Sequence, residues 1–279
     1  MNSLSSSTPL HNSTCFIIIL IIVVSCKLTN AIVKLPPNVT VPAVLVFGDS
    51  IVDTGNNNNN LRTTARCNFP PYGKDFKGGI PTGRFSNGKV PSDLLVEELG
   101  IKELLPAYLD PNLQPSDLLT GVCFASGGAG YDPLTSQTSS TISLSGQLDL
   151  FKEYIEKLRV LVGEEKTNFI LTNSLVLVVF GSNDISNTYF LSRIRQVQYD
   201  FPSYADFMVN SASNFLERTA AGGIERKIVV EYNEAVELYN NKLSKGLASF
   251  NQYYPNSRIV YIDVYNPLLD IIVNSDKYA

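Results

Sequence analysis

A serine follows the first apolar run of the sequence, where a nucleophile could act. The run Val44 to Phe47 is apolar, and Gly48, Asp49 and Ser50 follow it directly. Because reactive groups in an open parallel sheet lie beyond the carboxyl ends of the strands, this order predicts a strand that delivers Ser50 to that edge. The same order also fits an ordinary turn. A nucleophilic role therefore requires other segments to supply a base, oxyanion donors and a pocket.

Two further apolar segments end in glycine and polar side chains. The segment 121–125 leads into a glycine loop at 126–130, and the run 174–180 ends in Gly181, Ser182, Asn183 and Asp184. The glycine loop lacks the lysine of a Walker phosphate loop, which leaves two interpretations: N–H groups turned toward an oxyanion, or a close-packing turn. Three such exits in alternation with helices predict a doubly wound α/β fold whose loops meet at one edge of a parallel sheet.

Helical spacing of apolar residues predicts the elements that cover this sheet. Four segments carry it: 91–99, 145–161, 205–216 and 225–250. The asparagine run 56–60 predicts a loop. The segment 61–92 is rich in Gly, Pro and aromatic residues and predicts a long loop. Long loops in compact domains are usually functional, so we interpret this one as a wall of a substrate cleft, with an ordered surface excursion as the alternative.

Composition narrows the classes of function. A chain of 279 residues fits one α/β domain. The net charge of −4 and the absence of clustered Lys and Arg argue against a nucleic-acid partner. No motif predicts a metal or an organic cofactor. The single histidine is His11, so the remainder of the chain cannot form a Ser-His pair or a metal site that uses His.

The first 31 residues predict a secretory signal peptide, followed by one domain over 32–279. Phe16 to Val24 is an unbroken apolar run that is too short to cross a bilayer as a helix, and Thr29 and Ala31 suit a cleavage site. An uncleaved anchor is the alternative. Cleavage predicts an extracellular protein without a stable membrane span, and Asn38 begins a glycosylation sequon. In the domain, Cys67 and Cys123 fit either a disulfide or two free thiols.

These motifs, taken in order, resemble the GDSL-motif (SGNH) esterase/lipases. The likeness rests on Phe47-Gly48-Asp49-Ser50, on the glycine loop 124–130 and on Gly181-Ser182-Asn183-Asp184. The stretches NFPPYGKDF and PTGRFSNGK are similar to the extracellular-lipase-like members of the plant branch. The resemblance implies a three-layer α/β/α, flavodoxin-like domain around a five-stranded parallel sheet. It also implies hydrolysis of small-molecule or lipid esters through an acyl-enzyme.

The resemblance also implies roles for particular residues. Ser50 is the expected nucleophile. Its own N–H, a glycine N–H of the second motif and the side-chain amide of Asn183 are the expected oxyanion donors. We favour Gly128 for that glycine, with Gly130 as the alternative. A paired-carboxylate glycosidase that uses Asp49 and Asp184 is a competing hypothesis. The sequence does not predict an oligomeric state.

The sequence departs from the family pattern in two places. The family's general base is a His in an Asp-x-x-His motif near the C-terminus, and this chain reaches Ala279 without that motif. In addition, only a few residues separate the predicted helices 205–216 and 225–250, where the family has a strand. We therefore expect an internal deletion near Glu217 and a sheet that lacks one inner strand and the C-terminal region. Such a chain is predicted to be a poor esterase, with a silent ester-binding relative or a non-functional truncated product as the alternatives.

Overall fold

Two parallel strands form the centre of the molecule. The computed structural model describes residues 35–59, 62–220, 222 and 235–253. Strand β1 (Val44–Gly48) pairs in parallel with β2 (Leu175–Val179), and Gly48 lies opposite Val179. Every residue of β1 is buried, as expected for a strand covered on both faces. The first and third predicted strands are thus confirmed.

The segment 121–125 lies along the other edge of β1. Val46 donates its N–H to the carbonyl of Val122 at 3.2 Å and accepts from the N–H of Phe124 at 2.7 Å. The segment forms only isolated parallel bridges, from Cys123 to Val46 and to Ala107, so it is extended but not a regular strand. The second predicted exit therefore occupies its expected place in the sheet. The reason for its irregularity is that its outer edge meets the short stretch around Ala107 instead of a full strand.

Helices follow the strands and include those predicted at 91–99, 145–161 and 205–216, of which the second ends well beyond its predicted bound. They are α2 (Asn56–Asn59), α3 (Pro91–Glu98), α4 (Pro115–Leu118), α5 (Pro133–Ser139), α6 (Leu144–Asn173), α7 (Phe201–Ala220) and α8 (Ala235–Tyr253), with the 3-10 helices η1 (Lys77–Gly79) and η3 (Arg195–Val197) and the π-helix η2 (Asp184–Leu191). Helix α6 extends beyond the predicted segment because its chain resumes a helical course after a break at Gly163 (φ 79°). Helix α8 confirms the later part of the prediction 225–250, and residues 225–234 lie outside the described ranges.

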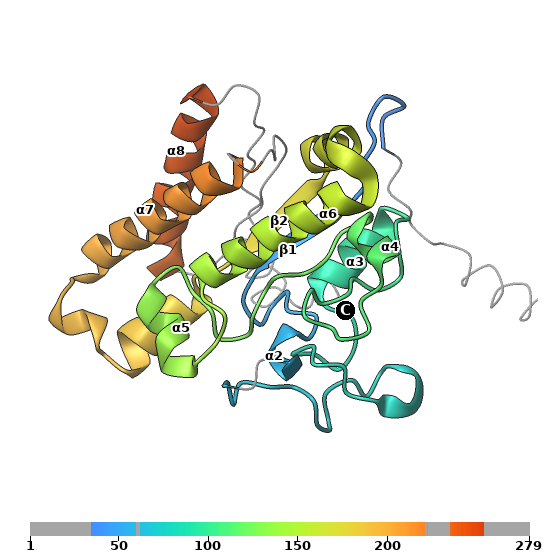
Figure 1. The fold of residues 1–279 in the computed structure, drawn as a ribbon. Helices are drawn as coiled ribbons and strands as arrows, with labels where there is room; N and C mark the ends of the chain where they lie inside the picture. The colour runs from blue at the N-terminus through green and yellow to red at the C-terminus, as the bar shows by residue number, and fades with distance from the viewer. Residues whose placement is uncertain (1–34, 60–61, 221, 223–234, 254–279) are drawn as a thin grey trace, which may run out of the picture.

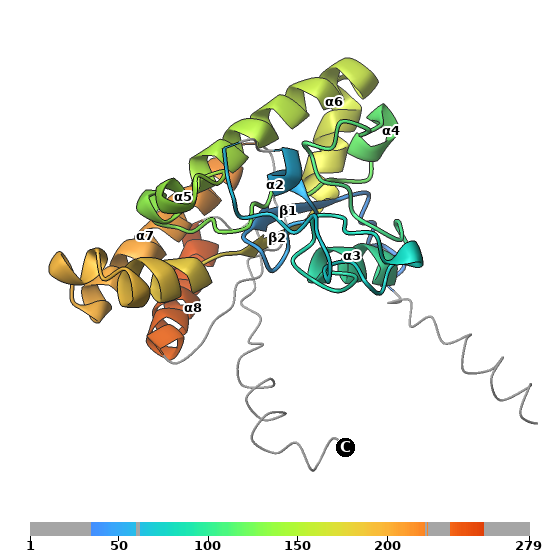
Figure 2. The ribbon, with the colours of Figure 1, turned by 90° about the horizontal axis from the view of Figure 1, so that it is seen from below.

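The helices cover both faces of the strands, as Figures 1 and 2 show. Alternate residues of β1 point to opposite faces. Leu45 and Phe47 pack with the apolar face of α6, while Val44 and Val46 pack with Val96 of α3. This is a three-layer α/β/α arrangement, and the described part of its sheet is smaller than the five strands that the resemblance implies.

The asparagine run is the clearest local correction. The prediction of a loop at 56–60 is wrong, because Asn56–Asn59 forms one helical turn, α2, with Asn56 and Asn57 fully buried. Residues 62–90 form the expected long loop, which contains η1, and the last two residues of the predicted segment 61–92 begin α3. Cys67 and Cys123 are both buried free thiols. Among the described helices, none combines the length and apolar composition needed to cross a bilayer. The leader 1–31 lies outside the described residues.

Candidate functional site

Asp49 joins the loop after β1 to the loop after β2. Its side chain is fully buried, and its carboxylate accepts hydrogen bonds from Ser182 Oγ at 2.8 Å and from the N–H of Ile51 at 3.0 Å. The Nδ2 of Asn183 lies 3.4 Å from the same carboxylate, which is long for a hydrogen bond. The polar residues that follow Gly48 and Gly181 are therefore in contact, although 133 positions separate Asp49 from Ser182.

Asn183 connects these two loops to the glycine loop. Its Nδ2 donates to the carbonyl of Ala129 at 2.9 Å, and its Oδ1 accepts from Asn187 Nδ2 at 3.1 Å. The expectation that three strand exits meet at one edge of the sheet is confirmed by these bonds. We call the residues 49–57, 126–132 and 182–187 the loop edge.

Ser50 lies at the loop edge with its hydrogen-bonding groups available. The side chain is half-buried. Among the described residues, neither the hydroxyl nor the N–H of Ser50 has a hydrogen-bond partner, whereas the neighbouring N–H groups of Asp49 and Ile51 donate to Val179 and to the Asp49 carboxylate. The chemistry expected of a nucleophile needs such a free hydroxyl and free N–H.

The two candidate glycines differ in their surroundings. Gly128 is half-buried and has a φ of +88°, a conformation that side chains disfavour. Gly130 is buried, and a Cβ there would lie 2.3 Å from Oδ1 of Asp184. The absence of a side chain at Gly130 is thus explained by packing. Neither N–H donates to an acceptor in the described part of the chain, but only Gly128 is partly open to solvent.

Buried carboxylates give the loop edge unusual acidities. Burial raises the pKa of Asp49 from 3.8 to about 6, against the opposing effect of its hydrogen bonds from Ile51 and Ser182. Burial likewise raises the pKa of Asp184 to about 7, although Thr135 Oγ1 donates to it at 2.6 Å. Both side chains are fully buried, and protein donors occupy their oxygens. A glycosidase pair must face its sugar, so this geometry contradicts the competing hypothesis.

Gln147 of α6 is a positioning residue that the sequence analysis missed. Its amide is fully buried and makes two hydrogen bonds with the last residue of β1. Oε1 accepts from the N–H of Gly48 at 3.0 Å, and Nε2 donates to the carbonyl of Gly48 at 2.9 Å. This clamp fixes the backbone two residues before Ser50. A signal was present in the sequence, since Gln147 shares a helix face with Phe151 and Tyr154, where apolar residues are expected.

Two buried asparagines, also missed, fasten α2 to the second motif. Asn56 Nδ2 donates to the carbonyls of Cys123 and Ala125, each at 2.8 Å, and its Oδ1 accepts from the N–H of Leu109 at 3.0 Å. Asn57 Nδ2 donates to the carbonyl of Gly127 at 2.8 Å. These bonds compensate the burial of the amides and explain why the run is not a solvated loop.

The long loop packs against the same edge. A Cβ on Gly127 would lie 2.3 Å from the ring of Phe85, so the glycine loop approaches this ring closely. Arg84, beside it, forms a buried ion pair with Asp93 of α3, with Nε 2.7 Å from Oδ2. These contacts support the interpretation of the long loop as part of the site's wall. In the described part of the chain, no cluster of three or more His, Cys, Asp or Glu side chains is arranged to hold a metal ion.

Comparison with known proteins identifies the family. The model of the GDSL-like Lipase/Acylhydrolase family matches residues 44–273. Among curated proteins of Arabidopsis thaliana, GDSL esterase/lipase EXL2 is 47% identical over 306 residues, covering 96% of this chain and 81% of that protein. GDSL esterase/lipase EXL3 is 50% identical over 275 residues, covering 90% and 75%. The chain therefore belongs to the GDSL-like lipase/acylhydrolase family, whose members hydrolyse ester bonds.

Proposed function

We propose that Ser50 is the nucleophile of an ester hydrolase that acts on small-molecule or lipid acyl esters. The observation that carries this proposal is the hydrogen-bonded meeting of three loops beside Ser50, through Asp49, Ser182, Asn183 and Ala129. In the proposed reaction the Ser50 oxygen attacks the ester carbonyl and gives its proton to a base. The alcohol then leaves, and water releases the acyl group from Ser50.

We further propose that three donors stabilise the oxyanion: the N–H of Ser50, the N–H of Gly128 and the amide of Asn183. The exposure of Gly128 supports it over Gly130. One hydrogen of Asn183 Nδ2 is bonded to the carbonyl of Ala129, and the other makes only a long contact with Asp49 at 3.4 Å, which a developing oxyanion would replace. Each such donor is typically worth about 3 to 4 kcal/mol of barrier.

We assign no residue as the general base that would activate Ser50. His11 is the single histidine of the sequence, and it lies in the proposed signal peptide. The alignment with EXL2, at 306 residues, is longer than this 279-residue chain, so EXL2 contains residues within the aligned region that have no counterpart here. This supports the proposed internal deletion. It also favours a second candidate function, a catalytically silent ester-binding relative, for the polypeptide without an added base.

Chemical rescue tests the nucleophile and the missing base together. The purified chain should hydrolyse p-nitrophenyl butyrate near the uncatalysed rate, because a serine hydroxyl is not activated without a base. Added imidazole should raise the rate above that of the Ser50→Ala variant at the same imidazole concentration. Equal rates of the two proteins at every imidazole concentration would support the silent relative. Rapid turnover without imidazole that survives Ser50→Ala would contradict the assignment of Ser50.

We also propose that residues 1–31 are removed on secretion and that 32–279 form the mature domain, extracellular and without a membrane anchor. Asn38 is exposed, as a glycosylation acceptor must be. Expression in plant cells should yield protein in the medium that begins at Ile32 by mass spectrometry and loses mass with a peptide N-glycosidase. Retention of an intact leader in membranes would identify an anchor instead.

A further inference from the structure

A pocket lies between α5 and the first turn of α6, next to the glycine loop. Its volume is about 840 Å³, within the range of small-molecule sites. Thr141 lines it, and a Cβ on Gly128 would lie 3.1 Å from Cγ2 of Thr141. The pocket therefore adjoins the loop edge, although neither Ser50 nor Asn183 lines it.

Unpaired donors gather in this pocket. The hydroxyls of Ser136 and Thr141 are buried and have no hydrogen-bond partner in the part of the chain that the structure describes, and Ser136 is only 2% exposed. The backbone N–H of Ser145, in the first turn of α6, also donates to no acceptor among the described residues. A buried hydroxyl without a partner destabilises the folded state, and a ligand rich in acceptor oxygens would remove that cost.

The charge around the pocket favours an anion. Arg62 contributes a positive charge, and the described lining includes no carboxylate. The first turn of α6 has no acidic residue, so the positive end of the helix dipole is not neutralised there. Ser143 caps the helix by accepting from the N–H of Gly146 at 3.2 Å, which leaves the N–H of Ser145 for a ligand.

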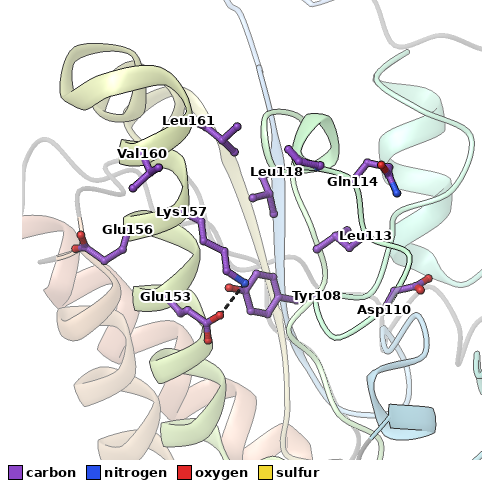
Figure 3. Close-up of a pocket in the computed structure, with 11 residues that line it drawn as sticks. Tyr108, Asp110, Leu113, Gln114, Leu118, Glu153, Glu156, Lys157, Val160 and Leu161 are labelled. Atoms are coloured by element: carbon purple, nitrogen blue, oxygen red, sulfur yellow. Dashed lines mark ion pairs between the residues drawn. The ribbon is translucent and has the colours of Figure 1, made fainter.

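A second pocket, shown in Figure 3, has the opposite character. It lies further along α6, has a volume of about 570 Å³ and includes three carboxylates in its lining, those of Asp110, Glu153 and Glu156. Its ammonium group, on Lys157, is paired with Glu153 at 2.7 Å and lies 4.8 Å from the centre of the Tyr108 ring. An anion would be repelled from this groove, which makes it an internal control.

We propose that the pocket between α5 and α6 binds a phosphate group, carried either by inorganic phosphate or by a phosphorylated alcohol. A tetrahedral phosphate presents several acceptor oxygens to donors that come from different directions, which are here Arg62, Ser136, Thr141 and the N–H of Ser145. This assignment does not depend on ester hydrolysis, because it concerns groups that take no part in the attack by Ser50.

Amide NMR of the ¹⁵N-labelled full chain tests the proposal at constant ionic strength. Inorganic phosphate and glycerol 3-phosphate are titrated separately, with sodium chloride as the reference. Saturable shifts are expected at the amides of Ser145 and Gly146 and not at those of Glu153 to Lys157. Tighter binding of glycerol 3-phosphate would identify an esterified phosphate as the ligand, and equal or tighter binding of inorganic phosphate would identify the free ion.

Variants give the decisive comparison. Arg62→Gln and Ser136→Ala should each weaken phosphate binding by about tenfold, as expected for a lost hydrogen bond to a charged group. Lys152→Gln also removes one positive charge, but at a position of α6 outside the pocket, where Lys152 pairs with Asp149 at 2.8 Å. This variant should change phosphate binding by less than about twofold. The proposal is overturned if phosphate causes no saturable shift, or if folded Arg62→Gln, verified by circular dichroism, binds phosphate as tightly as the unmodified chain.

Discussion

The loop edge and the pocket between α5 and α6 are neighbours, yet they differ in their buried polar groups. Most buried polar side chains of the loop edge are hydrogen-bonded, although the hydroxyl of Thr54 is buried without a partner among the described residues. At the loop edge Asn56 is fully buried and uses both ends of its amide, and Asp184 accepts from two N–H groups and the hydroxyl of Thr135. In the pocket the hydroxyls of Ser136 and Thr141 are buried, and none of the described residues bonds to them. The difference indicates that the loop edge is a fixed scaffold that holds reactive groups in place. The pocket, in contrast, is incomplete until a ligand enters it.

Removal of a fully bonded amide should have the largest effect on stability. Asn56→Ala leaves the carbonyls of Cys123 and Ala125 and the N–H of Leu109 without partners in a buried place. We expect the free energy of unfolding to fall by about 3 kcal/mol or more, measured by urea denaturation.

The exposed Asn112 provides the control for this experiment. Asn112→Ala makes the same change at a solvated position and should cost no more than about 0.5 kcal/mol. Equal losses for the two variants would show that the bonds of Asn56 do not hold the scaffold together.

The acidity of Asp49 predicts a smaller, pH-dependent effect. Its pKa is raised by burial to about 6 in the folded chain, above 3.8, so the folded state retains this proton to higher pH than the unfolded state. The contribution of Asp49 to stability is therefore greatest below about pH 4 and is lost as pH rises through about 6. Asp49→Asn keeps an acceptor oxygen but cannot ionise. The variant should gain roughly 2 kcal/mol relative to the unmodified chain between pH 4 and pH 7.

Urea denaturation at a series of pH values measures this change. A difference between variant and unmodified chain that stays constant from pH 4 to pH 7 would show that the Asp49 carboxylate is not desolvated. Asn112→Ala, which removes no ionisable group, should give such a constant difference and serves as the control.

The contrast also explains what the sequence alone could predict. Strand exits and the main helices follow from short patterns, such as the apolar run before Gly48 or the spacing of Leu148, Phe151 and Ile155, so they were predictable. The loop edge followed as well, because parallel strands bring their carboxyl ends together. Local pattern and family likeness also pointed to Ser50 and Asn183, whose catalytic roles stay predictions.

Partners that are far apart in sequence were not predictable. The helical turn at Asn56 exists because its amide meets carbonyls 67 and 69 positions away, and Gln147 meets Gly48 at a separation of 99. No local propensity encodes such pairings. The pocket was not predictable for the same reason. Ser136 and Thr141 look like ordinary polar residues in the sequence, and only the fold shows that their hydroxyls are buried without a partner among the described residues.

The same Thr→Val substitution, made at a bonded and at an unbonded threonine, should change the free energy of unfolding in opposite directions. These are the smallest of the predicted effects on stability. Thr135→Val in α5 removes a hydroxyl that donates to Asp184 of the loop edge, and we expect a loss of about 1 to 2 kcal/mol. Thr141→Val in the pocket removes a hydroxyl without a partner, and we expect a gain of about 1 kcal/mol in phosphate-free buffer.

Phosphate should reverse that gain if it is the ligand of the pocket. At a hundred times the dissociation constant, phosphate stabilises the unmodified chain by about 2.7 kcal/mol through preferential binding to the folded state. Thr141→Val binds more weakly and receives less of this stabilisation, so its advantage should shrink or change sign. Thr135→Val should keep the same deficit with and without phosphate. Thermal unfolding of the three proteins measures all of these differences, and a gain for Thr141→Val that phosphate leaves unchanged would separate this hydroxyl from the phosphate site.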